Sequence, residues 1–222
     1  RPPRRAVALD LRGHGESDPA ENGDYSIAGF AQDILAVADE LGLGRFVLVG
    51  HSFGALPAIE VAGTHPERVA GLLLVDPNGD QTRLDPTERE GLLGAVRRDP
   101  LGVTEEYFRQ LLVGGDREAA TWILEDLRAT DSAAIVGGLE AAASYSPTPA
   151  LARYVGPKLS AISSINDLPI SLHRLLPELP VHLVGGAGHW LQLDRPEAFE
   201  RVLDRFLDEV ESNDSRGALD AQ

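Results

Sequence analysis

Short apolar runs separated by helical patterns recur in the first third of the chain. The runs span residues 6–10 (AVALD), 46–50 (FVLVG) and 71–75 (GLLLV), and their apolar residues do not alternate with polar ones. Such runs are typical of strands that are buried on both faces, as in parallel sheets. Between the first two runs, Ser26 precedes a segment whose apolar residues fall on one helical face, and Gly42 is placed to end that helix.

A second helix is predicted from Phe53 to Thr64, ahead of the third run. Pro57 must lie near the first turn of this helix to be tolerated. Strands and helices that alternate in this order predict a parallel α/β sheet with right-handed crossovers.

From residue 77 to residue 157 the pattern contains helices only. They are predicted roughly at 86–98, 104–112, 117–129 and 132–143, with Pro and Gly pairs between them. A helical insertion of about 80 residues in an α/β chain is more typical of a covering subdomain than of a second independent core.

Strand patterns return after the helical insertion. They occupy residues 158–163 and 181–184, and a last helix is predicted over 196–210 with Pro at its start. The polar tail, residues 212–222, is expected to be disordered.

Charge and composition exclude several classes of protein. Acidic residues outnumber basic ones by 35 to 20, and the net charge of -15 opposes binding to nucleic acid and to anionic membranes. The absence of Cys excludes disulfides, a thiol nucleophile and Cys-ligated zinc. Because no stretch approaches the roughly 18 apolar residues of a membrane span, we expect a soluble, cytoplasmic protein. The absence of Met leads us to expect that the chain begins inside a longer protein.

The strongest chemical signal is the segment Gly50-His51-Ser52-Phe53-Gly54 between a predicted strand and a predicted helix. A G-x-S-x-G match in this context is typical of a nucleophile elbow, where the serine occupies a sharp, strained turn. The alternative is an ordinary glycine-rich turn. The strand before it and the helix after it favour the elbow, so Ser52 is the candidate nucleophile.

Two further motifs accompany the elbow in a fixed order. The segment DLRGHGES at 10–17 precedes it, and GAGHW at 186–190, followed by DRPEAF at 194–199, comes after it. With these motifs the chain, over residues 6–210, resembles the α/β-hydrolase fold family, specifically its capped esterase-like members. The resemblance implies a hydrolase core at residues 1–76 and 158–211, and a helical cap at 77–157 that is inserted after the sixth strand of the family's sheet.

A serine hydroxyl needs a base to become a good nucleophile, and the chain has six His candidates. His189 follows the strand pattern at 181–184 through a glycine-rich loop. It should therefore lie at the carboxyl edge of the sheet, where open α/β sheets build their sites, on the same side as Ser52. We predict that His189 is the general base.

The base needs a carboxylate that fixes its tautomer, and two candidates follow predicted strands. Asp167 is preferred, because the resemblance places the acid after the strand at 158–163, far enough ahead of His189 for one helix and one strand. Asp167 nevertheless lies one residue later than the family's common pattern. Asp76, directly after the strand at 71–75, is the alternative acid; the competing interpretation of Asp76 is that Asp-Pro simply closes that strand.

Negative charge that develops on the substrate oxygen needs hydrogen-bond donors. The Phe53 backbone N–H is one candidate. By resemblance, the second comes from a glycine-rich loop that should precede Arg12, and the chain holds no such loop. We therefore expect that the family's first strands are missing, including one that lies between the strands at 6–10 and 46–50. The side chains of Phe53 and Trp190 are candidates for lining an apolar substrate pocket.

The sequence thus predicts a cofactor-free serine hydrolase that forms an acyl-enzyme with a small, largely apolar ester, lactone or thioester. Cleavage of a carbon–carbon bond, or haloperoxidase or perhydrolase activity without a cofactor, uses the same triad and stays an alternative. A non-catalytic binding protein of the same fold is the alternative from another class. No motif points to a metal or a nucleotide.

Overall fold

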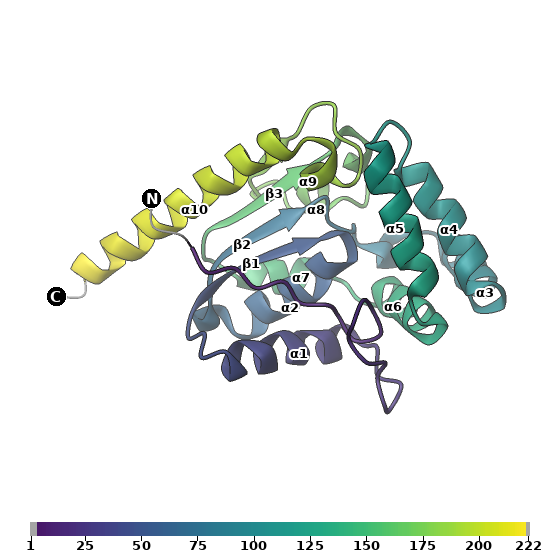
Figure 1. Ribbon diagram of the computed structural model, residues 1–222. Coiled ribbons are helices and arrows are strands. Elements are labelled where there is room, and N and C mark those ends of the chain that lie inside the picture. The colour runs from purple at the N-terminus through teal and green to yellow at the C-terminus, as the bar shows by residue number, and fades with distance from the viewer. Residues whose placement is uncertain (1–3, 221–222) are drawn as a thin grey trace.

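A parallel sheet of four strands forms the centre of the molecule (Figure 1). The computed structural model describes residues 4–220. Strands β1 (Phe46–His51), β2 (Val69–Val75), β3 (Lys158–Ile162) and β4 (Val181–Leu183) lie side by side in chain order, each parallel to the next. β2 is buried along its whole length, as its continuous apolar run predicts.

Helices cover both faces of this sheet (Figure 1). Helices α1 (Ile27–Glu40), α2 (Ala55–Thr64) and α7 (Thr148–Arg153) lie on one face, and α10 (Pro196–Asp220) lies on the other. Successive side chains of β2 point to opposite faces of the sheet and pack into two separate apolar clusters. Leu72 and Leu74 pack into the cluster with α2 and α7, whereas Ala70, Leu73 and Val75 pack against α10.

Of the α-helices between β2 and β3 in the chain, the first four sit beyond the carboxyl ends of the strands (Figure 1). These inserted helices are α3 (Pro86–Arg98), α4 (Pro100–Leu111), α5 (Arg117–Ala129) and α6 (Ser132–Ser144). Each begins after an aspartate whose carboxylate accepts a backbone N–H of the first turn, namely Asp85, Asp99, Asp116 and Asp131. The division into a hydrolase core at 1–76 and 158–211 and a cap at 77–157 stays a prediction.

The helix boundaries differ from the sequence pattern at two places. α4 begins at Pro100 rather than near residue 104, because Asp99 caps it and proline is tolerated in a first turn. α7 was not predicted, since Pro147 and Pro149 read as helix breakers, yet both lie at its start. Two further short helices are α8 (Leu172–Leu175) and α9 (Leu191–Asp194).

The strand predicted at residues 6–10 is wrong. This segment is extended but joins no sheet, and the Val7 side chain is 47% exposed. β1 therefore forms an edge of the sheet, with Val49 50% exposed. A strand needs a neighbour for its backbone hydrogen bonds, and residues 6–10 have none in the part of the chain that the structure describes.

The end of the chain also differs from the prediction. Helix α10 continues to Asp220, where the sequence predicted a disordered tail from Ser212, and residues 221 and 222 lie outside the described residues. Arg45 pairs with Asp214 in this extension, and Arg4 donates to Asp208 and Glu211 in the turn before it, so ion pairs join the end of α10 to the N-terminal half.

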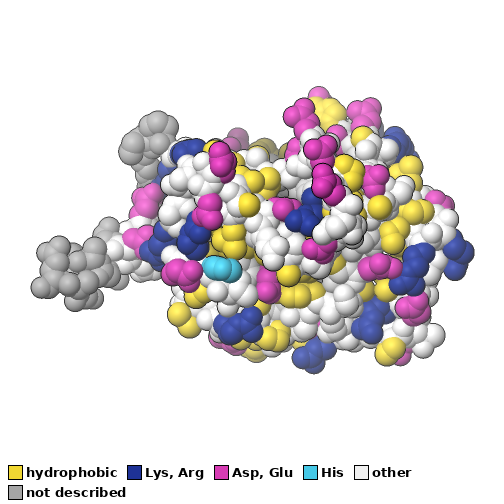
Figure 2. Space-filling view, turned by 90° about the horizontal axis from the view of Figure 1, so that it is seen from below, with side chains coloured by type: hydrophobic (Ala, Val, Ile, Leu, Met, Phe, Trp, Pro, Cys, Tyr) yellow, Lys and Arg dark blue, Asp and Glu magenta, His cyan; other side chains and the backbone are white. Residues whose placement is uncertain are grey.

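Acidic and basic side chains are interspersed with apolar ones on the face seen from below (Figure 2). Although the chain carries a net charge of -15, the acidic side chains on this face do not gather into one patch. None of the helices in the described part of the chain is both long enough and apolar enough to cross the bilayer.

Helix α6 packs closely on the core through a glycine, which gives a first prediction. A Cβ on Gly137 would lie 2.6 Å from the Cβ of Tyr25, a buried residue. We expect Gly137→Ala to lower the free energy of unfolding by about 1–3 kcal/mol, because overpacking forces the neighbours to shift. Gly91→Ala in α3 is the matched control, since its Cβ would meet nothing within 4 Å. The control should gain up to about 1 kcal/mol from helix propensity. Denaturant unfolding measures both, and equal changes would contradict the packing argument.

Candidate active site

Ser52 sits on a strained turn directly after β1. Its φ of +50° lies in the left-handed region, which costs a residue with a side chain about 1–2 kcal/mol. The turn depends on Gly50, because a Cβ there would lie 2.7 Å from both the Gly54 oxygen and the Ala55 Cα. Gly54 has free space around it and is not required sterically. The elbow predicted from the motif is therefore present, and Gly50 is the glycine that permits it.

His189 reaches Ser52 from the loop after β4, as the sequence predicted. Its Nε2 lies 2.8 Å from the Ser52 Oγ, and its Nδ1 lies 2.7 Å from the Asp76 Oδ2. A carboxylate can only accept a hydrogen bond, so Nδ1 carries the proton. Nε2 is then the unprotonated nitrogen and accepts the hydroxyl proton of Ser52. The His189 side chain is only 9% exposed, which shields this pair from water.

Asp76 is a fully buried carboxylate at the end of β2, with 0% exposure. It accepts hydrogen bonds from the Ser163 backbone N–H at 2.6 Å, from the Ser163 hydroxyl at 2.9 Å and from His189. Its φ of +42° is the second left-handed value outside glycine among the described residues. Strain of this kind persists where the surroundings fix the residue, as the hydrogen bonds do here.

The structure does not bring Asp167 to His189, so the preferred acid of the sequence analysis is misplaced. Both carboxylate oxygens of Asp167 accept from Arg174 at 2.6 Å, and the His173 ring lies 3.0 Å away. The Arg174 guanidinium and His173 lower the pKa of Asp167 to about 2. The side chain is 43% exposed. Asp167 therefore belongs to a surface ion pair, and Asp76, the alternative, occupies the place beside His189.

Two side chains of the site were not singled out in the sequence. Ser163 holds Asp76, and Asn78 places its Oδ1 3.3 Å from the Ser52 Oγ. Both follow the ends of neighbouring parallel strands, β3 and β2. That position at the carboxyl edge of the sheet is the signal that could have found them.

His51 supports the loop that carries His189. Its Nε2 lies 2.9 Å from the His189 backbone oxygen, and the two rings are 4.8 Å apart. The backbone oxygen only accepts, so His51 donates. Burial, together with the neighbouring His189, lowers the pKa of His51 to about 4, and the ring is therefore neutral at pH 7.

Trp190 packs next to the base, and an aromatic side chain of an inserted helix packs against Trp190. The Trp190 ring packs edge-on against His189 at 4.9 Å, and Phe108 of α4 packs against Trp190 at 5.6 Å. Partial burial raises the pKa of the neighbouring Tyr107, and the negative charge of Asp76 raises it further. The Phe53 ring instead packs edge-on against Phe30 at 5.3 Å.

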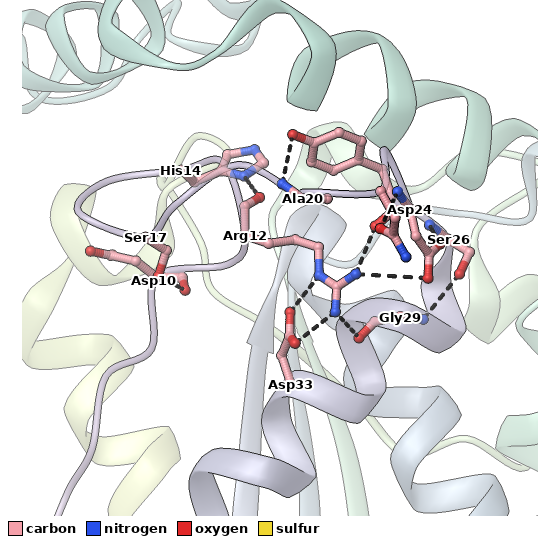
Figure 3. A network of polar contacts seen from close by, with 11 residues as sticks. Asp10, Arg12, His14, Ser17, Ala20, Asp24, Ser26, Gly29 and Asp33 are labelled. Carbon is pink, nitrogen blue, oxygen red and sulfur yellow. Dashed lines mark hydrogen bonds and ion pairs between the residues drawn. The ribbon is translucent and has the colours of Figure 1, made fainter.

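The DLRGHGES loop is anchored by one guanidinium (Figure 3). Arg12 donates to both oxygens of Asp33 at 2.6 Å and to the backbone oxygens of Asp24 and Gly29 at 2.7 and 3.0 Å. The loop is thereby fixed to helix α1. A Cβ on Gly13 would lie 2.6 Å from the Ala134 Cβ, so α6 packs directly on this loop.

Asp194 links the loop of the base to an inserted helix. One of its oxygens accepts the Gly188 N–H and the other accepts the Asp116 N–H, both at 2.8 Å. Gly188 precedes His189, and Asp116 caps α5.

The neutral state of His51 makes stability depend on pH. In the unfolded chain a histidine takes up its proton near pH 6.5, whereas in the fold His51 does so at about 4. Because the unfolded state then binds more protons, the contribution of His51 to the free energy of unfolding should fall as pH drops from about 6.5 and level off below about 4. Between pH 7 and pH 4, wild type should lose roughly 3 kcal/mol more than His51→Gln. Denaturant midpoints at each pH measure this. His65→Gln, at an exposed helix end, should follow wild type, and parallel curves for all three proteins would contradict the argument.

The chain matches known proteins along nearly its whole length. It is 28% identical to 2-hydroxymuconate semialdehyde hydrolase from Pseudomonas putida, over 94% of this chain and 79% of that protein. It is 30% identical to 2-hydroxy-6-oxononadienedioate/2-hydroxy-6-oxononatrienedioate hydrolase from Burkholderia vietnamiensis, over 91% of this chain and 76% of that protein. The solved structure of a thermophilic esterase from Thermogutta terrifontis, with malate bound, matches with a TM-score of 0.77. At 24% identity over 90% of this chain and 78% of the esterase, this last likeness shows the fold.

A family model described as the alpha/beta hydrolase fold matches residues 4–196. This range contains the elbow, the loop of the base and all four strands. The match confirms the resemblance that the three sequence motifs carry. The protein belongs to the α/β-hydrolase fold family.

Proposed function

We propose that this protein is a serine hydrolase in which Ser52, His189 and Asp76 form the catalytic triad. The observation that carries the proposal is the continuous hydrogen-bond chain of 2.8 Å from Ser52 to His189 and 2.7 Å from His189 to Asp76. The reaction is the hydrolysis of a small, largely apolar ester, lactone or thioester. Members of the same family that act as hydrolases and esterases support the reaction class.

The geometry assigns each side chain a step in acylation. The Ser52 Oγ attacks the carbonyl carbon of the substrate while its proton passes to Nε2 of His189. Asp76 keeps the ring in this tautomer and stabilises the imidazolium that forms. The carbonyl π electrons move onto the substrate oxygen, and the Phe53 backbone N–H is placed by the elbow to donate to it.

Collapse of this intermediate and hydrolysis by water complete the cycle. The carbonyl double bond forms again as the bond between the carbonyl carbon and the leaving group breaks. The leaving oxygen or sulfur takes the proton from His189, and the acyl group stays on Ser52 as an ester. Nε2 then takes a proton from water as the water oxygen attacks the same carbon. The bond from Ser52 to that carbon breaks, Oγ recovers the proton, and the free acid departs.

The inserted helices α3 to α6 are proposed to act as the cap of this site. Phe108 of α4 contacts Trp190, and Trp190 packs against His189. An inserted helix therefore contacts a residue that packs directly on the base. Such aromatic surface favours an apolar substrate. We assign Trp190 to the substrate pocket. Phe53 is a second candidate for the pocket lining, and its ring also packs edge-on against Phe30.

A second candidate is cleavage of a carbon–carbon bond by the same triad. It is favoured by the 30% identity to a hydrolase named for a dienedioate and by the likeness to one named for a semialdehyde. A diketone-like substrate of that class and a p-nitrophenyl ester, offered to the same preparation, separate the two reactions. A kcat/KM at least tenfold higher for one substrate class assigns the chemistry.

Removal of the nucleophile or the base should abolish most of the activity. Ser52→Ala and His189→Ala are each expected to lower the turnover of p-nitrophenyl butyrate by about three to six orders of magnitude. The double variant should be little worse than either single one, because the two residues act as a unit. A fluorophosphonate probe should label wild type at Ser52 and leave Ser52→Ala unlabelled. A folded wild type that resists the probe would instead support a binding protein, and a His189→Ala turnover within tenfold of wild type would contradict the triad.

The two carboxylates provide a matched pair for testing the acid. Asp76→Asn should lower kcat by about a hundredfold to ten-thousandfold, because the hydrogen bond that fixes the His189 tautomer is lost. Asp167→Asn removes only an exposed ion pair and should leave kcat within about threefold. Steady-state kinetics with p-nitrophenyl butyrate measures both variants. The opposite ranking would return the role to Asp167.

A further inference from the structure

A cavity between the last strand and the last helix is lined by basic side chains. It lies between β4 and α10 and has a volume of about 170 Å³. His182 of β4 and Arg201 and Arg205 of α10 line it, together with Gly185 and apolar side chains. None of the described residues that line the cavity is acidic. The whole chain has 35 acidic and 20 basic residues, so the charge of this lining is opposite to that of the chain.

The fold brings the three basic side chains to one place. Arg201 and Arg205 are four residues apart, so they lie one helical turn from each other on the same side of α10. Side chains alternate along a strand, and His182 therefore shares the face of Val184, which packs into the apolar cluster with α10. Two like charges at this helical spacing repel each other, and a bound anion would relieve that repulsion.

Neither guanidinium is neutralised within the part of the chain that the structure describes. Arg201 and Arg205 form no hydrogen bond and no ion pair there. Asp204 and Asp208, on a neighbouring side of α10, pair with Arg4 instead. A guanidinium stays protonated over the whole pH range in which proteins are folded. The positive charge of this pair is therefore permanent, and the described residues do not balance it.

Gly185 adds a backbone donor and open space to the cavity. Its N–H has no acceptor among the described residues. A Cβ at Gly185 would meet nothing within 4 Å, so a ligand can approach the backbone there. Each arginine offers N–H groups in a planar fork that fits two oxygens of one anion, and His182 can add a ring N–H. The lining thus offers several donors to an oxyanion and no carboxylate that would repel it.

We propose that the cavity between β4 and α10 binds a phosphate group, either as inorganic phosphate or as part of a small organic phosphate ester. A phosphate group carries about −1.5 to −2 charges at pH 7, which matches two guanidiniums better than the single charge of a carboxylate does. Because Arg201 and Arg205 are exposed, the organic part of an ester can extend into solvent. None of the triad residues lines this cavity, so the site is separate from the one that performs the hydrolysis.

Isothermal titration calorimetry of the chain with inorganic phosphate, near neutral pH and at constant ionic strength, tests this site. We expect one phosphate per chain with a Kd below about 1 mM. The Kd should rise when sodium chloride is added, because salt screens exposed charges. Arg201→Gln and Arg205→Gln should each raise the Kd by about tenfold or more, since each removes a charged hydrogen-bond donor.

Arg98→Gln is the matched control. Arg98, at the end of α3, is also exposed and forms no ion pair among the described residues, but it lies outside the cavity. This variant should keep the Kd within about twofold of wild type, because a single distant charge on the surface is screened. Thermal midpoints without phosphate show that each variant is folded, and they should not change, because the substituted side chains are exposed.

Glycerol 3-phosphate and acetate, titrated in the same way, identify the ligand. If glycerol 3-phosphate binds as tightly as inorganic phosphate, the site takes organic phosphates, whereas binding of inorganic phosphate alone assigns it to the free ion. Acetate that binds as tightly as phosphate would contradict the assignment to a phosphate group. A wild type without measurable phosphate binding overturns the proposal. So does a Kd that is the same in wild type and in both arginine variants, because the phosphate would then bind elsewhere.

Discussion

A carboxylate without access to water has to be satisfied entirely by donors of the protein, and Asp76 is such a group. Its donors come from two other elements: Ser163 after β3, and His189 in the loop after β4. One buried charge therefore fixes the ends of three neighbouring strands relative to each other. The orientation of His189 toward Ser52, and with it the reactive geometry, depends on this set of hydrogen bonds.

Much of the architecture follows from local sequence signals. The buried run of β2 and the Pro and Gly pairs between the inserted helices predicted these elements, because burial and chain-breaking residues act over a short stretch of sequence. The segment at 6–10 has the same kind of apolar run, yet forms no strand. A run of residues specifies what a strand would bury, whereas hydrogen bonding depends on which segment lies beside it. Pairing is a property of the whole fold, and the local pattern does not contain it.

Ser52 and His189 were predicted directly, whereas Asp76 was named only as the alternative acid. Asp167 and Asp76 both follow strands, and the family resemblance together with the spacing to His189 made Asp167 the preferred choice. What separates them lies elsewhere in the sequence: Arg174 neutralises Asp167 at the surface, and Ser163 offers two donors only to Asp76. Partners brought together by tertiary packing decide which carboxylate is buried. The left-handed φ of Asp76 is likewise visible only in the folded chain.

Asp194 joins two parts of the molecule that have different tasks. Its two oxygens hold Gly188, beside the base, and Asp116, at the start of α5. Helix α5 cannot swing outward as a rigid body without giving up one of these hydrogen bonds. The same side chain thus holds the start of α5 and the loop of the base, so a substitution that removes the Asp194 carboxylate deprives both of a hydrogen-bond acceptor at once.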